Sequence, residues 1–302
     1  MHKPVLFCVS VLLVTVSLLA YADAKTVHTE KSLYRNISVV KEGDLTCLVF
    51  ETRKENPPYQ TCKDENDPKR FVFSYTKLIL TGLLYNANPE KILVIGLGGG
   101  TLPMALSEML PNAEITSVEI DPAVIKLAKQ YFEYQESPRI KTVERDGRLF
   151  IKRAALKKES FDWIILDAFN GDYIPEHLMT QEFLQEVKSV LSETGIITAN
   201  TFSQSKLYAY ESATYHSVYG DFYNVKRKNT GNRIVLAPAQ QPLIKLSKLE
   251  LNATRWESTF EQYGVDVDWL LDHIQTKKDW DQTSDLLTDQ YAPANLLKFD
   301  KE

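Results

Sequence analysis

The stretch ILVIGLGGGT at residues 92–101, followed by ITSVEID at residues 115–121, decides the fold of this chain. The first stretch opens with the apolar run at residues 92–95, which is typical of a buried strand, and the second opens with residues 115–118, which we also expect to form a strand. The first run ends in glycines and the second in acidic residues, and the segment between them has the length of a helix. Two such strands joined by a helix form a βαβ unit, so the sequence predicts a parallel sheet covered on both faces.

The same alternation continues along the chain. Residues 32–73 resemble short strands, such as 36–40 and 46–50 around a turn at 41–44. Residues 239–302 contain three tryptophans, which favour a packed helical tail over a linker. Further strands are expected at 140–143, 161–166 and 195–199, and helices at 74–85, from the glycines to Leu110, and at 122–132, 147–156 and 180–191. The expected divisions are a signal peptide (1–24), an N-terminal β-domain (25–73), a nucleoside-binding catalytic domain (74–238) and the tail (239–302).

Composition excludes two broad classes of protein. The chain has 302 residues, of which 44% are hydrophobic and 25% charged, as in an ordinary globular protein. Its net charge is −5 and its basic residues are scattered, so it lacks the basic stripe of a nucleic-acid groove. Because it has a single long apolar run, it is not a polytopic membrane protein.

That apolar run lies at the start of the chain. A basic segment at residues 1–3 precedes apolar residues 5–19, and Ala22-Asp23-Ala24 offers the small residues that a signal peptidase requires. We therefore expect a protein exported to the periplasm or secreted, whose mature chain begins near Lys25. An uncleaved membrane anchor is the alternative.

The three cysteines fit export. Cys8 lies in the apolar run, while Cys47 and Cys62 flank a turn segment and could face each other across a hairpin. Spacing leaves two possibilities open for this pair, a disulfide or two buried thiols. With five histidines and no Cys/His cluster at metal-ligand spacing, the sequence predicts no metal site.

The glycine loop and the acidic residue that follows it predict a nucleoside site. Glycines at a strand end let the backbone approach a ligand, with a helix N-terminus behind them. Glu119 follows at the end of the next strand, where a carboxylate can accept both ribose hydroxyls. This pattern also fits NAD, but Asp146-Gly147 at the next strand end suits the adenine edge of an adenosyl-sulfonium ligand.

Asp167 ends the following predicted strand, and Asp172 lies on the loop after it. Ligands of open α/β sheets bind beyond the carboxyl ends of the strands, so Asp167 is expected to face the reactive end of the bound ligand. Two carboxylates beside a sulfonium could hold a cationic amine and take its proton. The alternative is that these residues simply form turns.

Taken together, several segments resemble the polyamine aminopropyltransferase (spermidine synthase) family, and most closely its bacterial spermidine synthase-like branch. The resemblance covers residues 32–238 and extends into the tail. It implies a Rossmann-like, class I methyltransferase-type sheet preceded by a small N-terminal β-domain. The segments that carry it are residues 32–37, 71–75, 94–100, 118–122, 167–178 and 287–293.

The resemblance also implies roles for particular residues. Asp167 would be the proton acceptor, with Asp172 as a second catalytic and amine-binding acid, and Tyr75 would line the amine pocket. The co-substrate would be decarboxylated S-adenosylmethionine or S-adenosylmethionine, the acceptor a small-molecule amine, and the assembly a homodimer as in many members. The residues implied to bind the adenosyl donor are Gln60, Gly96, Gly98, Gly99, Glu119, Asp121, Asp146 and Gly147.

Three positions depart from the family pattern. The glycine loop has Gly99 where the family has an Asp, so we expect little discrimination between the two donors. Thr76 replaces an amide or imidazole after the pocket tyrosine. The second strand-end acid is Asn170, with Asp172 two residues later.

Three functions therefore remain open at this stage. The first is aminopropyl transfer to an acceptor such as putrescine, and the second is methyl transfer from S-adenosylmethionine. The third is binding of a nucleoside or polyamine outside the cytoplasm without catalysis. Retention of Asp167 and Glu119 favours an enzyme, whereas the signal segment and Gly99 favour the binding protein.

Overall fold

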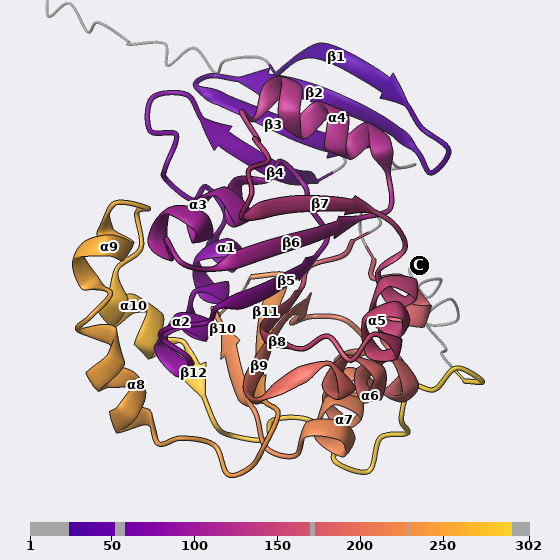
Figure 1. Ribbon diagram of the computed structural model, residues 1–302, viewed down its shortest axis with the longest axis vertical. Helices are drawn as coiled ribbons and strands as arrows, with labels where there is room; N and C mark the ends of the chain where they lie inside the picture. Colours follow the sequence, from indigo (N-terminus) through magenta and orange to yellow (C-terminus); the bar gives the residue numbers. More distant parts are fainter. Residues whose placement is uncertain (1–23, 52–57, 170–172, 229, 292–302) are drawn as a thin grey trace, which may run out of the picture.

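The computed structural model, which describes residues 24–51, 58–169, 173–228 and 230–291, contains two sheets (Figure 1). The smaller sheet lies at the N-terminus and is antiparallel, in the order β1-β2-β3-β4. The expected turn between two of its strands is present at Gly43 and Asp44. Its strands are β1 (Lys25–Lys31), β2 (Asn36–Glu42), β3 (Leu45–Phe50) and β4 (Tyr59–Asp64).

The larger sheet has the order β12-β10-β11-β9-β8-β5-β6-β7. The run from β9 to β7 is parallel, which confirms the predicted sheet, and antiparallel strands extend it beyond β9. Its strands are β5 (Lys91–Ile95), β6 (Glu114–Glu119), β7 (Ile140–Glu144), β8 (Phe161–Leu166), β9 (Leu191–Phe202), β10 (Tyr223–Lys226), β11 (Asn232–Pro238) and β12 (Ile274–Gln275).

Helices cover both faces of the larger sheet (Figure 1). Helices α1 to α3 and α8 to α10 lie on one side, α5 to α7 lie on the other, and α4 packs against the N-terminal sheet. The helix expected at 74–85 is divided at Leu80 into α1 and α2. The helices are α1 (Ser74–Ile79), α2 (Thr81–Tyr85), α3 (Thr101–Met109), α4 (Pro122–Tyr131), α5 (Gly147–Leu156), η1 (Glu176–Leu178), α6 (Gln181–Ser189), α7 (Tyr208–Tyr219), α8 (Leu246–Ala253), α9 (Glu257–Glu261) and α10 (Val267–Asp272).

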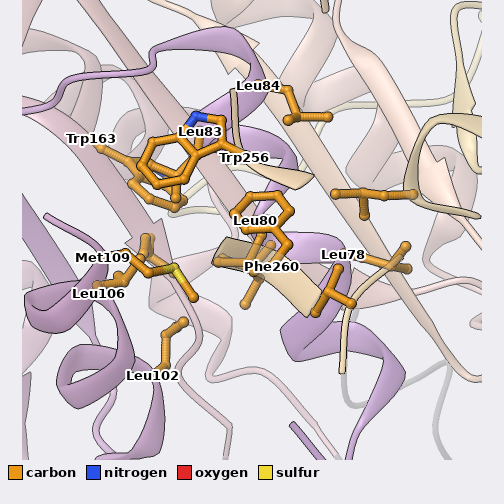
Figure 2. Packing of buried hydrophobic residues seen from close by; sticks show 14 of the residues in the cluster. Leu78, Leu80, Leu83, Leu84, Leu102, Leu106, Met109, Trp163, Trp256 and Phe260 are labelled. Carbon is orange, nitrogen blue, oxygen red and sulfur yellow. The ribbon is translucent and has the colours of Figure 1, made fainter. Parts of the chain in front are cut away.

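The tail contributes to the main core. Trp256 and Phe260 pack with Leu80 and Leu83 and with Trp163 of β8, as Figure 2 shows. Helices in the described part of the tail occupy residues 246–272, after which the chain adds the edge strand β12 and continues mostly without regular structure. The tail is thus packed against the molecule, but less of it is helical than the sequence suggested.

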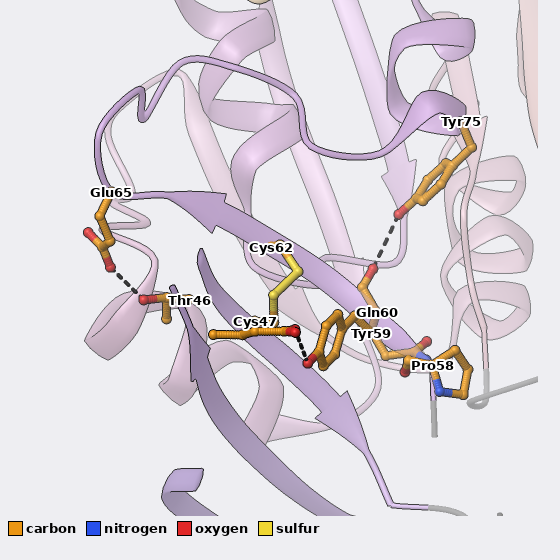
Figure 3. Close-up of a disulfide and its surroundings, with 9 residues drawn as sticks. Thr46, Cys47, Pro58, Tyr59, Gln60, Cys62, Glu65 and Tyr75 are labelled. Carbon is orange, nitrogen blue, oxygen red and sulfur yellow. Dashed lines mark hydrogen bonds between the residues drawn. A yellow bond between two sulfur atoms is a disulfide. The ribbon is translucent and has the colours of Figure 1, made fainter. Parts of the chain in front are cut away.

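Cys47 and Cys62 form a disulfide (Figure 3). They are directly opposite each other in the β3–β4 pairing, and both are buried. The bond therefore fastens β4 to β3, and of the two possibilities left open for the pair the structure has the disulfide.

The expected signal segment, residues 1–24, lies outside the described residues except for Ala24. In the described part of the chain, no helix combines the length and apolarity that crossing a bilayer demands.

Candidate functional site

A cavity of about 270 Å³ lies where the N-terminal sheet meets the carboxyl ends of the parallel strands. The N-terminal sheet contributes Phe50, Gln60 and Thr61 to its wall. The larger sheet contributes residues that follow β5, β6, β7 and β8. Those that the sequence singled out and the cavity brings together are Gln60, Tyr75, Gly96, Gly98, Glu119, Asp146, Gly147 and Asp167.

Gly96 allows the ends of β5 and β8 to approach each other. Its φ is +106°, and a Cβ at this position would lie 2.3 Å from the carbonyl oxygen of Asp167. The Asp167 amide in turn donates to the Ile95 carbonyl at 2.9 Å. A side chain at position 96 would push these strand ends apart, so glycine here fixes the position of Asp167.

Glu119 ends β6 and points its carboxylate into the cavity wall. One carboxylate oxygen accepts the Leu97 amide at 3.1 Å and the other accepts the Asp121 amide at 3.0 Å. These bonds fix the carboxylate beside the glycine loop, while burial raises its pKa above the usual value. Each oxygen can still accept a second hydrogen bond from a ligand hydroxyl.

Asp146 caps helix α5 and contacts a histidine that the sequence did not predict. Its Oδ1 accepts the Leu149 amide at 2.9 Å, and its Oδ2 lies 2.8 Å from Nε2 of His177. The hydrogen bond with His177 is the main reason that the pKa of Asp146 lies below its usual value. His177 lines the same cavity and holds the Asp146 carboxylate in one orientation.

Asp167 follows β8 and lies deep in the molecule, open to the cavity. Burial raises its pKa to about 7, against the opposing effect of a hydrogen bond from Asn200 Nδ2 at 2.8 Å. A carboxyl with such a pKa can accept a proton near neutral pH.

Tyr75 lies in the first turn of α1 and lines the same cavity as Asp167. Its hydroxyl donates to the backbone carbonyl of Gln60 at 3.4 Å (Figure 3). Burial, and then the charge of Asp167, raise the pKa of Tyr75, so its hydroxyl stays protonated. Thr76 lines the cavity beside it.

Two predicted site residues do not line the cavity. The carboxylate of Asp121 accepts the Ala123 amide at 3.0 Å and the Ser32 hydroxyl at 2.6 Å. Because a helix beginning at Pro122 leaves amides unpaired, this buried acid is used to cap α4 and to bind the segment after β1. Asp121 is thus buried away from the cavity lining, and its role in binding the donor stays a prediction.

Gly99 is the second predicted residue that is not part of the cavity lining. A Cβ at this position would lie 2.8 Å from the Phe132 ring and 2.9 Å from Cγ2 of Thr61. An Asp placed here in this chain would displace these neighbours, so the expected link between Gly99 and the choice of donor is not supported. Asp172 and Asn170 lie outside the described residues.

Sequence reasoning missed Arg35 and His177 in the cavity wall, and Asn200, which binds Asp167 without lining this cavity. Arg35 lines it with its guanidinium carbon 4.3 Å from the centroid of the Phe50 ring, and burial lowers its pKa. Asn200 could have been found because it is the polar residue directly after the predicted strand 195–199. His177 could have been found because it lies in the loop that follows the strand ending at Leu166. Arg35 lies within a segment that carries the family resemblance, but nothing in its spacing indicates a cavity.

Comparison with known proteins gives a consistent family. The model of the spermine/spermidine synthase domain matches residues 72–239. A polyamine aminopropyltransferase from Vibrio vulnificus is 44% identical over 299 residues, which span 98% of this chain and 99% of that protein. An eEF1A lysine and N-terminal methyltransferase from Bos taurus is 34% identical over 44% of this chain and 21% of its own length.

A solved structure shows the same fold. The crystal structure of a probable spermidine synthase from Corynebacterium glutamicum superposes with a TM-score of 0.64 at 21% identity, covering 85% of this chain and 98% of that one. The Rossmann-like sheet with an N-terminal β-sheet, expected from the sequence, is thus confirmed.

Proposed function

This chain belongs to the spermine/spermidine synthase family of polyamine aminopropyltransferases, and we propose that it transfers an aminopropyl group from decarboxylated S-adenosylmethionine to a diamine such as putrescine. The main support for the proposed site is the position of three acidic residues. Glu119, Asp146 and Asp167, from three different strand ends, line one cavity with the glycine loop. In the sheet order β7-β6-β5-β8, Asp146, Glu119 and Asp167 match the adenine, the ribose and the reactive end of an adenosyl donor.

The donor would lie across the strand ends. Asp146 and Gly147 would bind the adenine edge, while Glu119 would accept the ribose hydroxyls. The sulfonium would then lie near Asp167, where a buried carboxylate favours a cation. The cavity wall also contains Phe50 and Phe169, which exclude water from the reacting atoms.

The chemistry then needs positioning and one proton acceptor. The nitrogen of the amine attacks the aminopropyl carbon bonded to sulfur, the C–N bond forms, and the C–S bond breaks. Its electron pair remains on sulfur and gives neutral methylthioadenosine, while the proton lost from nitrogen goes to the Asp167 carboxylate. Tyr75 would line the path of the amine, and Asp172 would hold its distant ammonium group.

Methyl transfer is the second candidate, but it has weaker support. The methyltransferase from Bos taurus resembles less than half of this chain, whereas the aminopropyltransferase from Vibrio vulnificus resembles nearly all of it. The relatives' names also favour a transferase over a protein that binds without catalysis.

The nucleoside product distinguishes these candidates. Purified protein should be incubated with putrescine and either donor, and the products identified by mass spectrometry. We expect methylthioadenosine and spermidine from the decarboxylated donor. S-adenosylhomocysteine from the other donor would instead indicate methyl transfer, and binding of methylthioadenosine without turnover of either donor would indicate a binding protein.

We also propose that the protein is exported, with residues 1–24 as its signal peptide. The basic start, the apolar run and the small residues before Lys25 support this, as does the Cys47–Cys62 disulfide, because such bonds persist in oxidising compartments. Fractionation of cells followed by N-terminal sequencing tests it. A chain recovered from the cytoplasm with Met1 in place would contradict the proposal, and a membrane-bound chain would indicate an anchor.

The family resemblance further leads us to propose a homodimer. Sedimentation equilibrium on the chain from Lys25 measures the assembly directly, and a monomer at micromolar concentration would contradict it.

A further inference from the structure

Asn200 lies next to Asp167 because of the register of two parallel strands. Leu166 of β8 is paired with Ala199 of β9, so the residues that follow them, Asp167 and Asn200, are neighbours. Asn200 is 4% exposed, and its Nδ2 donates to Oδ1 of Asp167 at 2.8 Å. One oxygen of the Asp167 carboxylate is thus bound by Asn200, and among the described residues no side chain donates to the other.

A second asparagine fixes the orientation of this amide. Asn232 of β11 donates from Nδ2 to Oδ1 of Asn200 at 3.0 Å. Since the amide oxygen of Asn200 accepts from Asn232, its NH₂ group is the end that faces Asp167. An amide turned the other way would present an oxygen to the carboxylate and would require Asp167 to carry a proton.

We propose that Asn200, oriented by Asn232, is a positioning residue that keeps Asp167 ionised and directs its second oxygen toward the attacking amine. The proposal rests on the proposed function, in which Asp167 takes the proton. A hydrogen bond to the charged form of an acid favours that form and opposes the effect of burial. The pair thus tunes the base instead of contacting the substrate.

Other ionisable groups face Asp167 from the surrounding elements. Tyr75 on α1 and, across the cavity, Glu119 and Arg35 share its space. Behind Asn200, a cavity of about 20 Å³ is lined by Glu211 and Tyr215 of α7. Glu211 pairs with Arg233 at 3.4 Å, while burial raises the pKa of Glu211 to about 7 against the opposing charge of Arg233.

The test compares variants that alter the hydrogen bond from Asn200 to Asp167 with a matched control. Asn200→Ala removes the amide that donates to Asp167, and Asn200→Asp keeps the shape of the side chain but places a second acid beside Asp167. Asn232→Ala removes the hydrogen bond that orients the Asn200 amide. Thr198→Val is the control, because Thr198 lies on the same strand and accepts the buried Trp163 indole N–H at 2.9 Å without contacting Asp167. For each variant, kcat is measured against pH, and the titration of Asp167 is followed by ¹³C NMR of labelled carboxyl groups, assigned with Asp167→Asn.

We expect the acidic midpoint of kcat and the NMR midpoint of Asp167 to rise together in Asn200→Ala by about one to two pH units. The rise should be larger in Asn200→Asp, where two acids adjoin, and smaller in Asn232→Ala. Thr198→Val should keep both midpoints. At pH 7 the Asn200→Ala variant should lose about tenfold or more in kcat and regain it at alkaline pH.

Equal midpoints in the parent and in Asn200→Ala, with a loss of rate that is the same at every pH, would overturn the proposal. The NMR titration does not require turnover. If the parent fails to turn over but the Asp167 midpoint still shifts in the Asn200 variants, the proposed function fails while the positioning role stands.

Discussion

At the scale of single residues, the buried carboxylate that is proposed to accept the proton, Asp167, lowers the free energy of unfolding when it is ionised. An exposed Asp has a pKa of about 3.8, whereas burial raises the pKa of Asp167 to about 7 in the folded protein. Below pH 4 the group is protonated in both states and contributes no difference. Between about pH 4 and pH 7 the unfolded chain loses its proton first, so the free energy of unfolding falls as the pH rises.

Asp167→Asn should therefore stabilise the protein above pH 7. The expected gain is at most on the order of 4 kcal/mol, since each pKa unit corresponds to about 1.4 kcal/mol. Urea unfolding of the parent and the variant at pH 4 and pH 8 measures it. A gain of the same size at both pH values would show that the carboxylate is not the cause.

Glu119→Gln should weaken nucleoside binding. The carboxylate accepts two backbone amides, so an amide NH₂ in its place would face one of these donors and lose the charge that favours ribose hydroxyls. We expect a loss of roughly 1.5–3 kcal/mol in the affinity for methylthioadenosine, measured by isothermal titration calorimetry. Glu144→Gln is the matched control, because Glu144 is the exposed partner of Glu119 on β7. Equal affinities of the parent and Glu119→Gln would mean that the ribose lies elsewhere.

Among single residues, the sequence predicted those members of the site that are placed by the end of a strand. Glu119, Asp146 and Asp167 each lie at or just after the end of a predicted strand, and the ends of parallel strands meet at one edge of the sheet. Asp121 and Gly99 lie in the same motifs but do not line the cavity, since Asp121 caps α4 and Phe132 packs against Gly99. Such placements depend on tertiary contacts that no local pattern contains.

At the scale of elements, β4 links the disulfide to the cavity. In the described sheet β4 is an edge strand that pairs with β3, and it carries Gln60 and Thr61 of the cavity wall directly before Cys62. The disulfide thus restrains the strand that forms this part of the wall.

Replacing Cys47 and Cys62 together by Ser should destabilise the protein and loosen this wall. Closing a loop of this length stabilises a fold by ~3 kcal/mol, because it restricts the unfolded chain. Urea unfolding of the chain from Lys25, with and without a dithiol reductant, measures the loss. Methylthioadenosine affinity should fall in parallel for the reduced parent, whereas the reductant should not affect the double Ser variant. Unchanged affinity on reduction would show that β4 does not depend on the bond.

Several elements of the parallel sheet were predicted with nearly correct bounds, but β10, β11 and α7 were not predicted and β9 is longer than the expected strand at 195–199. Helix α5 has the expected range, and β8 matches residue for residue. The edge strands β1 and β12 were not predicted, because β1 is polar and largely exposed and β12 has two residues. Such strands are defined by the neighbour with which they pair.

At the scale of the whole molecule, the site exists because two sheets meet. Helix α4 packs its apolar face on β2 and β3, and Asp121 binds Ser32, so the N-terminal sheet is held over the strand ends. The tail is held by Arg148, which pairs with Asp289 and Glu186 at 2.7 Å each. The sequence predicted the N-terminal β-domain and the larger sheet, but it did not predict how they are placed relative to each other. The presence of Arg35 and Thr61 in the cavity wall depends on that placement.

The most direct test of the account is the amount of methylthioadenosine and aminopropylated amine formed from decarboxylated S-adenosylmethionine and putrescine by the parent, Asp167→Asn and Asp162→Asn. Asp162 is the control because it lies at the opposite end of β8. We predict that the parent forms methylthioadenosine and aminopropylated amine in equal amounts, and that Asp162→Asn forms as much of each as the parent. Asp167→Asn should be about 10²-fold slower or more, with unchanged affinity for methylthioadenosine. A rate for Asp167→Asn equal to that of the parent, or S-adenosylhomocysteine as the nucleoside product when S-adenosylmethionine is supplied, would contradict the account.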